Sequence, residues 1–176
     1  MLRRLAHKVP APLRSRVRAR FEPALIREGD AAPEWVLRGH DGRWHQPIDG
    51  WALLVFYPGD RTKGCSLQLA DVESHANTLR DLGVRPFGIN PADVASHAAF
   101  ASDLALSFPL LSDPGGEVCK AYGSWMQLPL VSPEVVRTVY LVNPHRKVRL
   151  ANRGSPSIAA IVRSVEALQQ VTRAGM

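Results

Sequence analysis

Residues 51–65 read Trp51-Ala-Leu-Leu-Val-Phe-Tyr-Pro-Gly-Asp-Arg-Thr-Lys-Gly-Cys65, and this stretch decides the fold. Its apolar run from Trp51 to Tyr57 is typical of a central strand that is covered on both faces, and the strand ends at Pro58. A helix is predicted directly afterwards, from Ser66 to Leu82. Cys65 then lies in the first turn of this helix, where the helix dipole and unpaired backbone N–H groups favour the reactive thiolate.

Strand and helix patterns alternate along the rest of the chain. Apolar segments around Trp35 and near Trp44, joined by a turn at Asp41-Gly42, predict two short strands before the central one. The further predicted elements are a buried strand from Val84 to Ile89, a helix from Pro91 to Leu104 with Pro91 in its first turn, a short strand from Phe108 to Leu111, a helix from Gly116 to Tyr122, a strand from Val135 to Val142 with its hairpin partner from Lys147 to Asn152, and a helix from Ser157 to Val171 capped by Ser155. This alternation indicates an α/β sheet with helices on both faces.

The composition is that of an ordinary globular protein. The chain has 176 residues, of which 45% are hydrophobic, and this length suits one domain with a real core. No apolar stretch reaches the ~20 residues of a membrane span, and no signal-peptide core is visible, so a cytoplasmic protein is expected. Two cysteines are too few for a disulfide framework, and no clustered Cys/His spacing suggests a metal site.

The positive charge is concentrated at the N-terminus. Residues 1–27 hold eight Lys/Arg and one acid, a net charge of +7, whereas the remainder has fourteen Lys/Arg and fifteen Asp/Glu, a net charge of −1. We therefore divide the chain into a basic N-terminal extension, 1–27, and a domain, 28–176. The extension is interpreted first as a solvated arm. Contact with an anionic lipid, nucleic acid or acidic partner, a transit peptide, and a helix from Ala11 to Phe21 that packs on the domain or on a second subunit remain alternatives.

Three residues of the opening stretch carry a family signature. Pro58, Thr62 and Cys65 fill the pattern Pro-x-x-x-Thr/Ser-x-x-Cys, which resembles the active-site motif of the peroxiredoxins. The matching landmarks resemble the bacterioferritin-comigratory (Q-type) branch and span about Glu28 to Leu168; they are Gly29-Asp30-x-Ala32-Pro33, Phe56-Tyr57-Pro58, Phe108 to Asp113, Ala121-Tyr122-Gly123 and Arg137-Thr138. The resemblance implies a thioredoxin-like fold in its peroxiredoxin elaboration, a central mixed sheet with helices on both faces.

The resemblance also implies a thiol-dependent peroxidase for hydrogen peroxide and small organic hydroperoxides, with no cofactor. Cys65 corresponds to the nucleophile, which becomes a sulfenic acid. Thr62 corresponds to a hydrogen-bond donor to the peroxide, and Pro58 to the residue that shields the thiolate. Arg137, before Thr138, corresponds to the arginine that stabilises the thiolate and orients the peroxide.

The sequence departs from the branch near these residues. Lys63 stands where proline is usual, Gln68 replaces a common glutamate, and Asn90-Pro91-Ala92 replaces Ser-x-Asp. None of these changes removes a reacting group, so they indicate a divergent member with an altered rate or substrate preference. His75 and His97 are interpreted as structural, because this chemistry needs no general-base histidine.

A resolving cysteine is not found at the usual places. Ala70 occupies one of them, and the only other cysteine is Cys119, in a predicted helix. A core position for Cys119 is favoured over a resolving role, which predicts a one-cysteine cycle completed by an external thiol such as thioredoxin or a low-molecular-weight thiol. Trp125 is expected in a loop that reaches the pocket, and the apolar residues after it, Met126, Leu128 and Leu130, form either an apolar wall or a subunit contact in a homodimer.

Two rival functions remain open. A thiol–disulfide oxidoreductase of the same fold is disfavoured because it normally needs a second motif cysteine and does not need Thr62 or Arg137. A redox-sensing or interaction protein that acts through the basic arm, 1–27, is the other. Deletion of residues 1–27 distinguishes the peroxidase from the interaction protein, because peroxidase activity should survive the deletion and salt-dependent binding should not.

Overall fold

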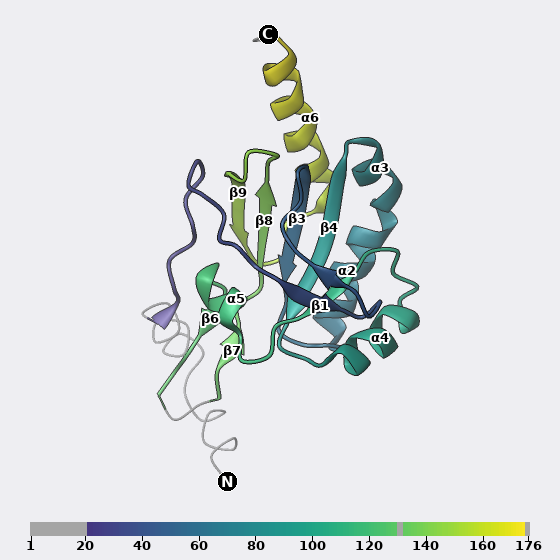
Figure 1. Ribbon diagram of the computed structural model, residues 1–176, viewed down its shortest axis with the longest axis vertical. Helices are drawn as coiled ribbons and strands as arrows, with labels where there is room; N and C mark the ends of the chain where they lie inside the picture. Colours follow the sequence, from purple (N-terminus) through teal and green to yellow (C-terminus); the bar gives the residue numbers. More distant parts are fainter. Residues whose placement is uncertain (1–20, 130–131, 175–176) are drawn as a thin grey trace.

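The computed structural model describes residues 21–129 and 132–174. Its centre is a seven-stranded mixed sheet in the order β2-β1-β5-β4-β3-β8-β9 (Figure 1). The strands of this sheet are β1 (Leu37–Gly39), β2 (Trp44–His45), β3 (Trp51–Phe56), β4 (Val84–Asn90), β5 (Leu110–Ser112), β8 (Thr138–Val142) and β9 (Val148–Arg153). A separate two-stranded sheet pairs β6 (Trp125–Met126) with β7 (Glu134–Val135), and the helices are α2 (Lys63–Ser74), α3 (Ala76–Asp81), α4 (Val94–Asp103), α5 (Glu117–Ala121) and α6 (Ile158–Ala174).

Strand β3 lies at the middle of the sheet, as its unbroken apolar sequence predicts. It runs parallel to β4 and antiparallel to β8, and the β8–β9 hairpin closes that edge. The side chains of β3 alternate between two cores. Leu53 and Val55 face a core built with α2, α3, α4 and α6, whereas Leu54 and Phe56 face a second core that includes α5. The predicted mixed sheet with helices on both faces is therefore confirmed.

The helix predicted from Ser66 to Leu82 is wrong as one element, because the chain breaks at His75 between α2 and α3. The ring of His75 lies 2.9 Å from the carbonyl oxygen of Asp71, to which Nδ1 donates a hydrogen bond. The backbone N–H of His75 donates to Val72 in a tight turn instead of continuing the helix. The sequence pattern missed the break because apolar periodicity does not register side-chain bonds to the backbone.

The strand predicted from Val135 to Val142 also divides into two. β7 pairs with β6, the backbone N–H of Val136 then donates to Ser124, and β8 begins only at Thr138. Arg137 lies at the point where the chain passes from the small sheet to the large one. This break gives Arg137 a position outside both ladders, from which its side chain is free to extend.

Two predicted helix starts are shifted, one by a local N-cap and one by a tertiary contact. Pro91 is not in the first turn of α4, since that helix begins at Val94 with Asp93 as its N-cap and the Ser96 N–H donating to it at 2.7 Å. Ser155 does not cap α6, which begins at Ile158, and the Ile158 N–H donates to a carboxylate oxygen of Asp71 on α2 instead.

Residues 22–27 contact the domain although the predicted boundary places them in the arm. The Ile26 N–H donates to the Tyr140 hydroxyl at 3.3 Å, and Arg153 donates to the carbonyl of Pro23. The predicted helix from Ala11 to Phe21 lies outside the described residues except for Phe21, as does Leu130. No helix within 21–129 and 132–174 is long and apolar enough to cross a membrane.

Gly88 on β4 provides a test of the core next to the sheet centre. A Cβ on this residue would lie 2.5 Å from Leu110 and 3.2 Å from Tyr57. We expect Gly88→Ala to lower the free energy of unfolding by about 1–3 kcal/mol, measured by urea denaturation, because the packed core has no room for a methyl group. Gly59→Ala is the control, since a Cβ there meets nothing within 4 Å. Equal stabilities of the two variants would contradict this packing.

Candidate active site

Cys65 lies in the first turn of α2, as the sequence predicts. Thr62 is the N-cap of the helix, and its Oγ1 accepts a hydrogen bond from the backbone N–H of Cys65 at 3.4 Å. The Cys65 side chain is fully buried against the core formed with α2 and α6. The local fold follows from the sequence, because Pro58 follows the end of β3 and Thr62 is a good N-cap residue.

Arg137 reaches this cysteine from the break between β7 and β8. Its Nη2 lies 3.2 Å from Cys65 Sγ, and its Nη1 donates to the carbonyl of Gly64 at 3.4 Å and to the side-chain oxygen of Gln68. A guanidinium keeps its positive charge at any physiological pH. A fixed positive charge in contact with the sulfur favours the thiolate over the thiol. Gly64 leaves room for this contact, because a Cβ there would lie 3.2 Å from Arg137 Nη2.

The other two predicted site residues, Thr62 and Pro58, are exposed in the loop between β3 and α2. Thr62 is exposed, and its hydroxyl can donate to the carbonyl of Gly59 at 3.4 Å. Both hydrogen bonds of this hydroxyl are long, so the group can turn towards a ligand. Pro58 is exposed directly after β3. The structure thus joins Cys65, Thr62 and Arg137 by contacts and places Pro58 at the start of their loop.

Cys119 lies on the opposite face of the sheet from Cys65. It is fully buried in the core that includes α5, whereas Cys65 belongs to the core with α2. Burial, together with the negative charge of Asp113, raises the pKa of the Cys119 thiol well above its usual range. Both cysteines are free thiols. A disulfide between them would require one to cross the sheet, which the folded chain does not permit.

Gln68 is the residue whose part in the site the sequence did not reveal. It is almost fully buried, and its side-chain oxygen holds the guanidinium of Arg137. Its Nε2 is buried and, within the described part of the chain, makes no hydrogen bond. The sequence showed this residue only as a departure from the family pattern. Its spacing, one turn after Cys65 on the same helix face, was the available signal.

The other departures lie further from the sulfur. Lys63 is exposed at the first position of α2. The Ala92 N–H donates to the side-chain oxygen of Asn90 at 2.6 Å, so this segment forms a turn that the asparagine stabilises. The sequence predicts Trp125 in a loop, but this residue lies in β6 and pairs with Val135 in the small sheet.

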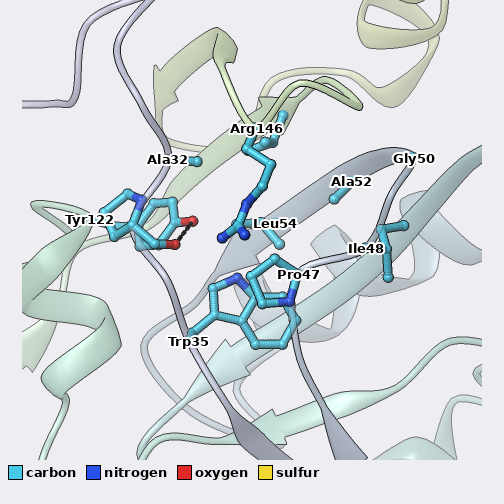
Figure 2. A pocket seen from close by; sticks show the side chains of 11 residues that line it. Ala32, Trp35, Pro47, Ile48, Gly50, Ala52, Leu54, Tyr122 and Arg146 are labelled. Carbon is cyan, nitrogen blue, oxygen red and sulfur yellow. Dashed lines mark hydrogen bonds between the residues drawn. The ribbon is translucent and has the colours of Figure 1, made fainter.

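A separate hollow on the opposite face of the sheet does not belong to this site. Figure 2 shows Trp35, Leu54, Tyr122 and Arg146 around it, and these residues belong to or pack beside the core on the Cys119 side. The Tyr122 hydroxyl donates to the carbonyl of Pro33, and Arg146 pairs with Glu34. These contacts fasten the chain before β1 to the sheet.

Comparisons with known proteins identify the family. A profile of the AhpC/TSA family matches residues 29–151. The chain belongs to this family. Its relatives include peroxiredoxin Q of Arabidopsis thaliana chloroplasts, 35% identical over 106 residues that cover 57% of this chain and 48% of the relative. Peroxiredoxin Bcp of Escherichia coli is 34% identical over 103 residues, which cover 57% of this chain and 66% of the relative.

Solved structures agree on the fold. The crystal structure of peroxidoxin BcpB from Mycobacterium tuberculosis has a TM-score of 0.75 at 25% identity and covers 81% of this chain and 97% of its own. Peroxiredoxin Q of Xanthomonas campestris has a TM-score of 0.72 at 23% identity, with 83% and 98% covered. The resemblance to Q-type peroxiredoxins and the thioredoxin-like fold are therefore confirmed. The matched region spans about half the length of the plant relative, 48%.

The two thiols should differ sharply in alkylation. We expect iodoacetamide at neutral pH to label Cys65 and to leave Cys119 unlabelled until the protein is unfolded, because burial and Asp113 keep the Cys119 thiol protonated. Arg137→Met should slow the labelling of Cys65 at neutral pH, since the charge that favours the thiolate is lost. Mass spectrometry of tryptic peptides measures both effects. Labelling of Cys119 at the rate of Cys65 in the native protein would contradict the burial.

Proposed function

We propose that this protein is a thiol-dependent peroxidase that reduces hydrogen peroxide and small organic hydroperoxides through Cys65. The observation that carries the proposal is the contact of 3.2 Å between Arg137 Nη2 and Cys65 Sγ, at the N-terminus of α2, in a chain of the AhpC/TSA family. A helix N-terminus and a guanidinium both favour a thiolate at this sulfur. The domain proposed for this chemistry is 28–176.

The reaction needs a nucleophile and donors for the oxygen that leaves. The Cys65 thiolate attacks one peroxide oxygen, the O–O bond breaks, and the other oxygen departs with the bonding pair and takes a proton to become water or an alcohol. Cys65 becomes a sulfenic acid. Arg137, the Thr62 hydroxyl and the Cys65 N–H would donate hydrogen bonds to the oxygen on which this charge develops. Pro58 would limit access of water to the thiolate.

An external thiol would complete the cycle. One thiol attacks the Cys65 sulfenic acid and releases water, and a second thiol then reduces the mixed disulfide and releases a disulfide of the reductant. Cys119 is not used, because it lies in the core on the other face of the sheet. Thioredoxin or a low-molecular-weight thiol in the cytoplasm, where thiols are kept reduced, fits this requirement.

Stopped-flow oxidation tests the function directly. Reduced wild type, Cys65→Ser and Cys119→Ser would each be mixed with about one equivalent of hydrogen peroxide, with tryptophan fluorescence as the signal and intact mass as the endpoint. We expect fast oxidation in wild type and Cys119→Ser, a mass gain of one oxygen, and no fast phase in Cys65→Ser. A loss of two hydrogens that Cys119→Ser abolishes would make Cys119 the resolving residue. Oxidation at the rate of a free thiol would refute the peroxidase.

The neutral side chain of Gln68 should leave the positive charge of Arg137 free to stabilise the Cys65 thiolate. Gln68→Glu places a carboxylate on the same guanidinium and close to Cys65, which disfavours the thiolate. We expect Cys65 of the variant to be alkylated more slowly at neutral pH and to react several-fold more slowly with peroxide. Leu67→Gln, an exposed change one position earlier on α2, is the control. An unchanged alkylation rate in Gln68→Glu would show that Gln68 does not tune the site.

A further inference from the structure

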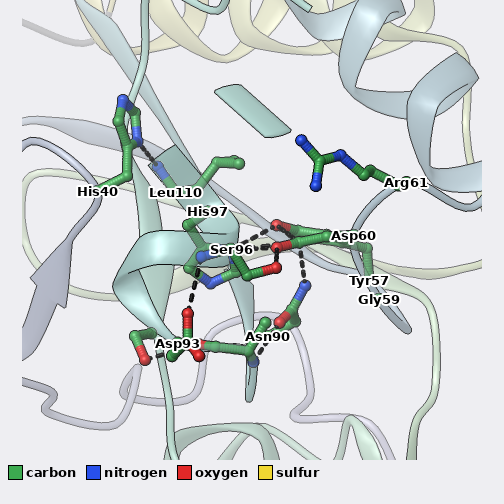
Figure 3. Close-up of polar contacts among 12 residues, drawn as sticks. His40, Tyr57, Gly59, Asp60, Arg61, Asn90, Asp93, Ser96, His97 and Leu110 are labelled. Carbon is green, nitrogen blue, oxygen red and sulfur yellow. Dashed lines mark hydrogen bonds and ion pairs between the residues drawn. The ribbon is translucent and has the colours of Figure 1, made fainter. Parts of the chain in front are cut away.

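A buried polar cluster anchors the loop that leads from β3 to Cys65. Asp60, two residues after Pro58, extends its carboxylate towards Asn90 of β4 and Ser96 of α4 (Figure 3). The carboxylate accepts hydrogen bonds from the Tyr57 hydroxyl at 2.9 Å, the Asn90 amide at 2.9 Å, the Ser96 hydroxyl at 2.6 Å and His97 Nδ1 at 3.0 Å. One side chain of the loop is therefore bonded to two elements of the fold, β4 and α4, and to Tyr57 directly after β3.

His97 has three polar contacts. Its Nδ1 lies 3.0 Å from the Asp60 carboxylate and 3.4 Å from the Tyr57 hydroxyl, and its Nε2 lies 3.2 Å from the carbonyl oxygen of Leu111. The Tyr57 hydroxyl has one proton and donates it to Asp60 at the shorter distance of 2.9 Å, and neither an ionised carboxylate nor a carbonyl can donate, so a proton on both ring nitrogens satisfies these contacts. His97 is fully buried and the Asp60 side chain is 6% exposed. An imidazolium beside a carboxylate, with charges that cancel inside the protein, fits this geometry.

The groups around the pair are consistent with these charges. Burial would raise the pKa of Asp60, but hydrogen bonds from His97 and Ser96 and the positive charge of His97 hold it at about 2. Burial, and then the charge of Asp60, raises the pKa of Tyr57, so its hydroxyl stays a neutral donor. His40, another titratable group near the pair, accepts the Leu110 N–H at Nδ1, and burial lowers its pKa, so it is neutral. Arg61, also near Asp60, is a permanent cation whose guanidinium pairs with Asp103.

The loop needs an anchor at this place. Arg61, directly after Asp60, has φ 56°, a left-handed backbone conformation that is unfavourable for a residue with a side chain. Thr62 then caps α2 and bonds the Cys65 N–H. The exposed ion pair between Arg61 and Asp103 is a weak constraint on the turn. Asp60 is the only residue of the segment 58–62 whose side chain is bonded into the interior of the described fold.

We propose that the buried His97–Asp60 ion pair holds the loop of Thr62 in the conformation that receives the peroxide, and that loss of the His97 proton releases this loop. His97 is a positioning residue, since it acts through Asp60 and does not contact Cys65 or the substrate. A neutral ring would place an unshared electron pair of Nδ1 against the carboxylate, or leave the Leu111 carbonyl without a donor. The inference that the loop receives peroxide rests on the proposed function.

Nuclear magnetic resonance tests the charge of the pair without any turnover. Reduced wild type and His97→Gln, both labelled with 15N-histidine, would be compared at pH 7.5. The protein has six histidines, and the ring signals that are absent from the variant are those of His97. We expect both ring nitrogens of His97 to show the chemical shifts of a protonated imidazolium. One unprotonated ring nitrogen would overturn the inference. This result is independent of whether Cys65 reduces peroxides.

A rate measurement tests the positioning. The rate constant for oxidation by hydrogen peroxide, divided by the thiolate fraction from iodoacetamide labelling at the same pH, isolates the geometry of the site from the charge of the sulfur. We expect His97→Gln and Asp60→Asn to lower this corrected rate roughly tenfold, as small displacements of reacting groups do. His75→Gln, at the break between α2 and α3, should stay within about twofold. Equal effects of the His75 and His97 changes would overturn the proposal.

The pH dependence distinguishes positioning from a merely structural role. Both quantities would be followed up to pH 10. In wild type, the corrected rate should fall at the same pH at which the His97 signals show loss of a proton. In His97→Gln the corrected rate should show no such step. A step in the rate without proton loss at His97, or proton loss without a step, would overturn the proposal.

Discussion

The contact between a guanidinium and the sulfur of Cys65 is the constraint on which the rest of the site depends. It joins two residues 72 positions apart, one in the first turn of a helix and one in the segment between two strands. Inside a ladder the Arg137 side chain would point perpendicular to the sheet. The chain solves this by leaving the ladder at Val136 and Arg137 before β8 begins. The small sheet of β6 and β7 directs the chain to that point.

The central sheet keeps the two ends of this contact in register. β3 carries the loop to Cys65 and pairs directly with β8, which follows Arg137; Phe56 lies opposite Thr138. The loop to Cys65 and the segment that carries Arg137 therefore leave the sheet at adjacent positions on two neighbouring strands. Packing on both faces of β3 makes this arrangement rigid, because protein cores are dense and resist small displacements. The same two cores keep Cys119 away from Cys65.

Local patterns were sufficient to predict the elements that packing and periodicity determine. The apolar run 51–57, the helix start at Cys65 and the hairpin at the end of the sheet all follow from residues near in sequence. The breaks at His75 and Arg137 could not be predicted, because hydrogen bonds to Asp71 and Ser124 produce them. The motif with its distant arginine gave the candidate residues only through resemblance to a family. The structure adds the contact between Arg137 and the sulfur, while their roles in catalysis remain proposals.

One departure from the family pattern, Gln68, affects the charge around Cys65. Gln68 brings a neutral amide to Arg137 where the branch commonly has an acid, so this contact of the guanidinium adds no negative charge next to Cys65. The acid that the loop does carry, Asp60, is turned into the interior and paired with His97. Negative charge close to a thiolate disfavours it, and with His97 as the proposed imidazolium the paired carboxylate would contribute little field at the sulfur. In this chain the loop therefore gains a strong anchor without weakening the positive environment that Arg137 provides.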